Sequence, residues 1–263
     1  MLVFESSDGT KIVYDRQGEG PALLLVDGAL CTRNTGSKPE LARLLASHFT
    51  VYSYDRRGRG DSGDTLPYAV QREIEDIEAL IELAGGTASL YGHSSGASLA
   101  LEATVELGNK VEKLAMYEAP YNDDPVARRA WGVYISQLTE ALAEGRRGDA
   151  VALFMAYVDT PDEQIDGMRQ MPFWPDMEAV GPTLAYDHTA LLGQENSVPT
   201  DRAARVDVPT LVMYGDACFP FMRETAQTLA QLITDAELRN LEDQTHGVSP
   251  EVLAPVLVEF LRR

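Results

Sequence analysis

The chain has 263 residues, of which 44% are hydrophobic and 24% are charged. This composition is ordinary for a soluble globular protein and argues against disorder. The length suits one large domain, or one domain with a substantial insertion. The formal net charge of −19 repels nucleic-acid phosphates and anionic membrane surfaces, so we expect neither as a partner of the whole molecule.

No stretch approaches the roughly 20 apolar residues of a membrane span, and the first ten residues lack a basic region followed by an apolar run. We therefore expect a cytoplasmic protein. The two cysteines, Cys31 and Cys218, are too few for a disulfide framework and are interpreted as free thiols. The four histidines show no HExxH spacing, so the sequence indicates no metal and no cofactor. We expect a small-molecule substrate as the partner, and a monomer or homodimer.

Strands and helices alternate along most of the sequence. The continuous apolar run 22–26 is typical of a strand buried on both faces, and apolar residues in 70–83 recur at the three- and four-residue spacing of an amphipathic helix. The turn residues Ser7-Asp8-Gly9 join the first two strands into an antiparallel hairpin. In chain order, the predicted elements are strands 2–5, 11–15 and 22–26, helix 39–47, strand 50–54, helix 70–83, strand 88–91, helix 97–107, strand 111–117, strand 210–214, helix 222–233, strand 237–241 and helix 250–261.

This alternation predicts an α/β fold, a mostly parallel eight-stranded sheet with helices on both faces. Residues 121–205 break the alternation, because they show helical patterns but no convincing strand. We expect a helical cap insertion there, above a core domain made of residues 1–120 and 206–263. The proline-punctuated segment 172–175 either supplies aromatic walls to a pocket or acts as a hydrophobic staple between helices.

The segment Gly92 to Gly96 reads Gly-His-Ser-Ser-Gly, a G-x-S-x-G pattern placed directly after a predicted strand and before a predicted helix. In that position a sharp turn presents the serine oxygen at the carboxyl end of the sheet, and the glycines leave room for the crowded backbone. The following helix directs its free N–H groups at developing negative charge. We take Ser94 as a candidate nucleophile. The alternative is a glycine-rich turn in which Ser94 only caps the helix.

Two further segments complete a resemblance to the α/β-hydrolase superfamily that spans nearly the whole chain. Residues 54–62, Tyr-Asp-Arg-Arg-Gly-Arg-Gly-Asp-Ser, resemble the D-x-R-G-x-G-x-S loop after the fourth strand of that family. Residues 26–29, Val-Asp-Gly-Ala, resemble its H-G-x oxyanion segment, with aspartate in place of the commoner histidine. The resemblance implies that an oxyanion is held by the backbone N–H of Ala29, or of neighbouring Gly28, and by that of Ser95.

A serine hydroxyl needs a histidine within hydrogen-bond reach to remove its proton, and His246 is our candidate. It lies in a loop after the last predicted strand and before the terminal helix, where the family places its base. The other three histidines fit less well. His93 lies inside the turn and is expected to point away from Ser94. We expect His48 to be solvated at the surface and His188, within the insertion, at most to touch substrate.

The acid that orients the histidine has two candidates. The family's usual position for it, G-x-x-D after the seventh strand, holds Cys218, which cannot accept an N–H bond as a carboxylate does. Glu118 ends the sixth predicted strand, and some lactone-cleaving members of the family, including zearalenone hydrolases, take their acid from this place. Asp216 lies in the loop of the usual acid, but two residues early. We favour Glu118 and keep Asp216 as the alternative.

Serine at this turn disfavours the dehalogenase and epoxide-hydrolase chemistry that the family performs with aspartate. We therefore expect an enzyme, a serine hydrolase that cleaves a carboxylic ester or lactone of a small, mainly apolar substrate. Carbon-carbon bond hydrolysis and cofactor-free perhydrolysis are alternatives, as is an idle ligand-binding protein, which only the missing acid at Cys218 supports. The residues expected to line the pocket are Trp131, Met155, Phe173 and Trp174.

Overall fold

An eight-stranded sheet with the order β1-β2-β4-β3-β5-β6-β7-β8 forms the centre of the computed structural model, which describes all of residues 1–263. β1 pairs antiparallel with β2, and β2 antiparallel with β4, whereas all other neighbours run parallel. The predicted mostly parallel sheet of eight strands is therefore confirmed. The strands are β1 (Leu2–Glu5), β2 (Lys11–Gln17), β3 (Ala22–Val26), β4 (Thr50–Tyr54), β5 (Ala88–His93), β6 (Val111–Tyr117), β7 (Thr210–Gly215) and β8 (Ala236–Leu241).

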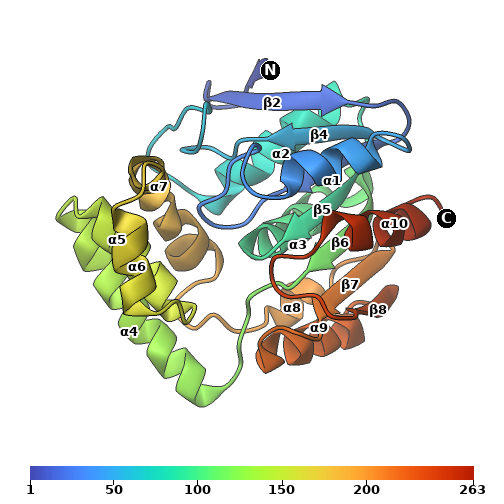
Figure 1. The fold of residues 1–263 in the computed structure, drawn as a ribbon. Helices are drawn as coiled ribbons and strands as arrows, with labels where there is room; N and C mark the ends of the chain where they lie inside the picture. Colours follow the sequence, from blue (N-terminus) through green and yellow to red (C-terminus); the bar gives the residue numbers. More distant parts are fainter.

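Helices cover both faces of the sheet. Successive residues of a strand point to opposite faces, so a strand that is apolar throughout, such as β3, needs helices on both sides to bury it. Leu23 and Leu25 of β3 belong to the core between the sheet and helices α1 and α10, which lie side by side in Figure 1. Leu24 and Val26 face the opposite way, toward α2, α3 and α9. The helices of these two layers are α1 (Lys38–Leu45), α2 (Val70–Leu83), α3 (Ser95–Leu107), α9 (Pro220–Leu232) and α10 (Pro250–Leu261).

Residues 121–205, which we call the helical insertion, connect β6 to β7 and contain no strand. Figure 1 shows its longer helices gathered at one side of the sheet. A π-helical turn in the last third of the insertion returns to the core and contacts α2 and α3. The elements of the helical insertion are α4 (Pro125–Ala143), α5 (Arg147–Tyr157), α6 (Asp162–Arg169), α7 (Trp174–Val180), the short turn η2 (Gly181–Thr183), the π-helical turn η3 (Ala185–Leu191) and α8 (Thr200–Ala203).

Several element ends differ from the sequence prediction by one or two residues. Helix α9 begins at Pro220, and not at the predicted residue 222. Proline is well suited to the first helical turn, since its missing N–H would have no partner there. Periodicity locates only the first buried apolar residue, Met222, so it places the start too late. None of the helices combines the length and apolar character needed to cross a membrane.

Candidate active site

Ser94 occupies a sharp turn between β5 and α3, with backbone angles φ 57° and ψ −131°. The left-handed φ of a non-glycine residue is a strained conformation that only surrounding structure can hold. The two flanking glycines make that turn possible. A Cβ atom at Gly92 would lie 2.5 Å from the Cα of Ala97, and one at Gly96 would lie 2.2 Å from the carbonyl oxygen of Val26. The backbone is therefore too crowded at both positions for any side chain.

Glu118 and His246 are joined by a hydrogen bond of 2.6 Å between Glu118 Oε2 and His246 Nδ1. Glu118 follows β6 directly and is 1% exposed, and His246 comes from the loop between β8 and α10. The other carboxylate oxygen of Glu118 accepts a bond of 2.9 Å from the N–H of Gly215. Because an ionised carboxylate only accepts, the proton of neutral His246 lies on Nδ1, which leaves Nε2 free to take a proton.

Asp216, the alternative acid, points away from this pair. Its Oδ1 accepts from the N–H of Asp243 at 2.7 Å and its Oδ2 from Asn240 at 3.2 Å. Cys218, which holds the family's usual acid position, donates its S–H to Oε2 of Glu118 at 3.1 Å. Burial, followed by the Glu118 carboxylate, raises the pKa of the Cys218 thiol to about 12, so the thiol is protonated near neutral pH.

His93 links the serine turn to the His246 loop. Its Nε2 lies 2.9 Å from the carbonyl oxygen of His246, and the two imidazole rings are 4.8 Å apart. Burial, helped by the proximity of His246, lowers the pKa of His93 to about 3, so the ring is neutral and donates to the carbonyl. No hydrogen bond joins Ser94 Oγ to His246 in this structure. Such bonds are often long in free enzymes and tighten when substrate binds.

The turn formed by Asp27, Gly28 and Ala29 lies against the serine. A Cβ atom at Gly28 would be 2.9 Å from Cβ of Ser94, so only glycine fits there. The N–H of Ala29 donates no hydrogen bond in this structure, and Ser95 is the first residue of α3, where N–H groups have no partner within the helix. The side chain of Asp27 turns toward Lys38, whose ammonium lies 2.8 Å away.

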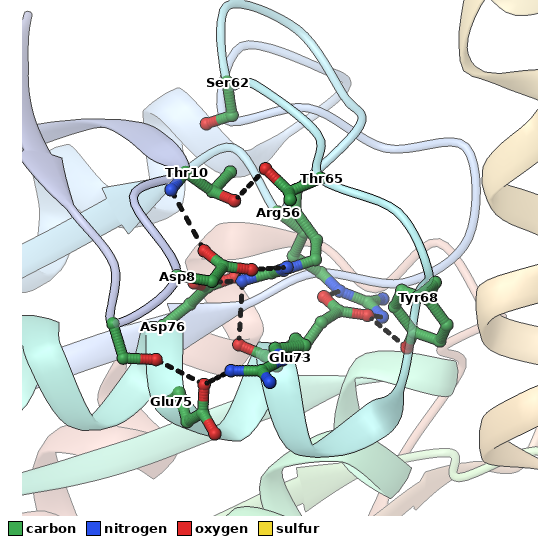
Figure 2. Close-up of polar contacts among 12 residues, drawn as sticks. Asp8, Thr10, Arg56, Ser62, Thr65, Tyr68, Glu73, Glu75 and Asp76 are labelled. Atoms are coloured by element: carbon green, nitrogen blue, oxygen red, sulfur yellow. Dashed lines mark hydrogen bonds and ion pairs between the residues drawn. The ribbon is translucent and has the colours of Figure 1, made fainter.

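Buried ion pairs support the loop that follows β4, a feature that the sequence did not reveal. Figure 2 shows Glu73 between Arg56 and Tyr68. Arg56 makes two bonds of 2.6 Å to the Glu73 carboxylate and a third, of 2.7 Å, to Asp187 of η3. Arg59 donates to the other oxygen of Asp187 at 2.5 Å. All four of these charged side chains have at most 1% of their area exposed.

The four residues predicted to line the pocket lie in different surroundings. The Trp131 indole donates to the carbonyl of Gly193 at 2.8 Å, and that of Trp174 donates to Glu178 at 2.8 Å. Trp131, Met155 and Trp174 are buried in the core that extends into the helical insertion. Phe173, in contrast, is 40% exposed. None of their hydrogen bonds or ring contacts reaches Ser94. The expectation that they bind substrate stays a prediction.

His188 is the one histidine of the helical insertion, and it sits in an aromatic cluster. Its Nδ1 lies 2.7 Å from the hydroxyl of Tyr134, and its ring is 5.3 Å from that of Trp131 and 4.9 Å from that of Phe154. Burial lowers the pKa of His188 to about 4, against the opposing charge of Asp187. His188 is therefore neutral at pH 7.

A cavity of about 190 Å³ opens beside His93. Asp27, Cys31, Lys38 and Gly247 are among the residues that line it, but neither Ser94 nor His246 does. Three atoms of the types that bind metals, on Glu118, Cys218 and His246, lie within 4.8 Å of one another. The hydrogen bonds described above already connect these three side chains.

The sheet, the serine turn and the acid–histidine pair together define the class of this protein, and comparison with known sequences agrees. A sequence model of the alpha/beta hydrolase family matches residues 33–256. Since the match covers most of the chain, the protein belongs to the alpha/beta hydrolase family.

Individual relatives match over nearly the full length. An alpha/beta hydrolase from Sphaerobacter thermophilus has a solved structure with 51% identity and a TM-score of 0.87, covering 99% of this chain and all of that one. A non-heme chloroperoxidase of Streptomyces lividans is 25% identical over 98% of both chains. A pimeloyl-[acyl-carrier protein] methyl ester esterase of Nitrosospira multiformis is 27% identical over 87% of this chain and 89% of its own.

Proposed function

We propose that the protein is a serine hydrolase that cleaves a carboxylic ester or lactone. The observation that carries this proposal is the 2.6 Å bond between Glu118 and His246 beside a serine held in the strained turn. The pair has the order and roles of a catalytic triad, in which a buried acid orients a histidine and the histidine activates the serine. Asp216 has other hydrogen-bond partners, which supports Glu118 as the acid.

In the proposed mechanism, Ser94 Oγ attacks the substrate carbonyl while His246 Nε2 takes the hydroxyl proton. Glu118 stabilises the imidazolium that forms. The N–H groups of Ala29 and Ser95 stabilise the tetrahedral oxyanion. Collapse of this intermediate releases the alcohol, which receives its proton from His246, and leaves an acyl-enzyme. Water then attacks the acyl group with His246 as base and Ser94 as leaving group, which restores the enzyme and releases the acid.

A small, mainly apolar substrate remains our proposal, bound between the sheet and the helical insertion. The esterase among the relatives acts on a methyl ester according to its name, which supports ester cleavage. Trp131, Met155 and Trp174 belong to the core that extends into the insertion and are candidates for the pocket wall. The exposed position of Phe173 makes it the weakest of the four candidates.

A cofactor-free perhydrolase is the second candidate. The full-length match to a non-heme chloroperoxidase favours it, and the same serine, histidine and acid would form the acyl-enzyme. Hydrogen peroxide would then replace water as the attacking molecule and give a peracid. The idle ligand-binding alternative was supported only by the missing acid at Cys218. The hydrogen bond between Glu118 and His246 removes that support.

A fluorophosphonate probe tests the proposed function directly. We expect the probe to label the wild type covalently and not to label Ser94→Ala. Circular dichroism checks that both proteins are folded. A panel of p-nitrophenyl esters and aromatic lactones, assayed with and without hydrogen peroxide, then separates hydrolysis from perhydrolysis. A folded wild type that neither reacts with the probe nor cleaves any panel member would refute the proposal.

A further inference from the structure

Two buried arginines hold two successive carbonyl groups of the turn beside Ser94. Arg56 donates from Nη1 to the carbonyl of Asp27 at 2.9 Å. Arg59 donates from Nη1 to the carbonyl of Gly28 at 2.6 Å. Both guanidinium groups are fully buried, so each bond is charge-assisted and shielded from water, and such bonds are stronger than neutral ones.

The bond from Arg59 also helps to fix the direction of an N–H group, because it is the shorter of the two bonds that the Gly28 carbonyl accepts, at 2.6 Å compared with 3.4 Å from the N–H of Cys31. The carbonyl of Gly28 and the N–H of Ala29 belong to one planar trans peptide unit, in which they point in opposite directions. With the carbonyl drawn toward Arg59, the N–H of Ala29 points away from the arginine. That N–H donates no hydrogen bond in this structure, and it is one of the two donors assigned to the oxyanion.

The position of Arg59 depends in turn on the helical insertion. Its guanidinium has one carboxylate partner, Asp187, at 2.5 Å, and its Nε has no hydrogen-bond partner. Arg56 differs, because Glu73 pairs with it as well. Burial alone would raise the pKa of Asp187, but the charges of Arg56 and Arg59 lower it to about 2. The carboxylate is therefore ionised throughout the neutral range and available to hold Arg59.

Asp187 lies on η3, the π-helical turn, and its neighbour Tyr186 helps to fix that turn on the core. The ring of Tyr186 stacks on Tyr68 with centroids 3.8 Å apart, and its hydroxyl donates to Asp64 at 2.5 Å. π-Helical turns are rare and occur often at functional sites. Tyr186 therefore fixes η3, and with it Asp187, against residues of the core.

We propose that Asp187 and Arg59 are positioning residues of the hydrolase, through which the helical insertion fixes the Ala29 N–H in the direction that the oxyanion requires. This inference rests on the proposed function and deepens that function. It gives the helical insertion a part in transition-state stabilisation, in addition to any part in substrate binding. Neither residue is required to touch the substrate.

Kinetics of Asp187→Asn test the inference. The variant keeps the shape of the side chain but removes the charge that holds Arg59. We expect kcat to fall about 10- to 100-fold, somewhat less than the 10²- to 10³-fold seen when an oxyanion donor is removed outright. KM should change less than threefold. Affinity for a boronic acid, which forms a tetrahedral adduct with Ser94, should fall in parallel with kcat/KM, while affinity for the product acid stays within threefold.

Asp76→Asn is the matched control. Asp76 makes two bonds of 2.8 Å to Arg57, and both side chains are fully buried. Arg57 also donates to Asp8 and to the carbonyl of Arg72, but it makes no bond to the turn beside Ser94. Figure 2 shows that Asp8 and Asp76 lie close together. We expect Asp76→Asn to lower the melting temperature and to leave kcat within threefold of the wild type.

A second variant covers the case in which Asp187→Asn does not fold. Arg59→Lys keeps the positive charge next to Asp187, but one ammonium cannot reproduce the fork of two donors that Arg59 uses. We expect kcat between that of the wild type and that of Asp187→Asn. Full kcat in a folded variant of either residue would overturn the inference, as would equal losses in Asp76→Asn. An unlabelled, inactive wild type would instead refute the proposed function, so the two failures are distinguishable.

Discussion

At the scale of single residues, the contacts of Glu118 are the basis for proposing it as the acid. It emerges from β6 with a left-handed φ of 49°, which turns its side chain toward the loop that holds His246. Its two oxygens are both used, one by the N–H of Gly215 and the other by His246 and Cys218. The place of the usual family acid is occupied by a thiol that donates to Glu118. Cys218 therefore contacts the proposed acid and does not take its place.

The first prediction compares the two acids. Glu118→Gln removes the negative charge that stabilises the imidazolium, so we expect turnover to fall on the order of 10⁴-fold, as in other triads whose acid becomes an amide. Asp216→Asn should stay within about twofold of the wild type, because the Asp216 side chain bonds only to Asp243 and Asn240. Steady-state hydrolysis of a p-nitrophenyl ester measures both. Comparable losses in the two variants would contradict the assignment.

At the scale of elements, the junction of β5 and α3 decides where the serine stands. The strand ends at His93 and the helix begins at Ser95, so Ser94 alone makes the turn. The close approach of α3 to β3 leaves no space beside Gly96. This approach brings the first turn of α3, with its unpaired N–H groups, next to the segment that contains Gly28 and Ala29.

The second prediction concerns that approach. A Cβ atom at position 96 would meet backbone atoms of Val26 and Asp27 at 2.2 and 2.6 Å, and backbone within a sheet cannot move aside cheaply. We expect Gly96→Ala to lower the free energy of unfolding by about 3 kcal/mol or more. The control is Gly132→Ala in α4, where no atom lies within 4 Å of the added Cβ. That variant should be more stable by about 0.5–1 kcal/mol, because alanine is the better helix former. Urea unfolding measures the free energy of unfolding of both variants. Equal changes in Gly96→Ala and Gly132→Ala would argue against crowding at the junction of β5 and α3.

At the scale of the whole molecule, buried ionisable groups join the helical insertion to the core. Asp187 pairs with Arg56 and Arg59 across this boundary, and His188 next to it lies neutral among aromatic rings. Removing one partner of a buried ion pair lowers the free energy of unfolding by more than the intact pair contributes, because an uncompensated buried charge remains. These groups therefore make the stability of the molecule depend on pH.

The third prediction follows from His188. Its pKa is about 4 in the folded protein, compared with about 6.5 in an unfolded chain, so the unfolded state binds more protons between these two values. The resulting stabilisation is fully present above pH 6.5 and is lost as the pH falls toward 4, by up to about 3 kcal/mol.

Urea unfolding at several pH values checks this. We expect the free energy of unfolding of His188→Gln to depend less on pH between 4 and 6.5 than that of the wild type. The difference between the two slopes should correspond to the uptake of one proton on unfolding. His48→Gln is the control, since His48 lies at the surface beside Arg262, and it should keep the wild-type slope. An unchanged slope in His188→Gln would show that His188 is not the titrating group.

The sequence by itself predicted the fold and identified Ser94 and His246 as candidate site residues. The alternating apolar patterns predicted the parallel sheet, because burial on both faces leaves a continuous signal in each strand. The glycine pattern around Ser94 identified the turn, because crowding there excludes side chains. The choice between Glu118 and Asp216 was different, since both carboxylates were expected at the same edge of the sheet.

Only the tertiary structure decided which carboxylate meets His246, and only it revealed that Asp187 reaches Arg56 and Arg59. The arginines lie 131 and 128 residues before Asp187 in the chain. No local pattern marks a contact between residues so far apart, because periodicity and turn signals act over a few residues, whereas a buried charge finds its partner only when the chain has folded. Side-chain direction, which decides hydrogen bonding at the site, depends on that packing and not on sequence position.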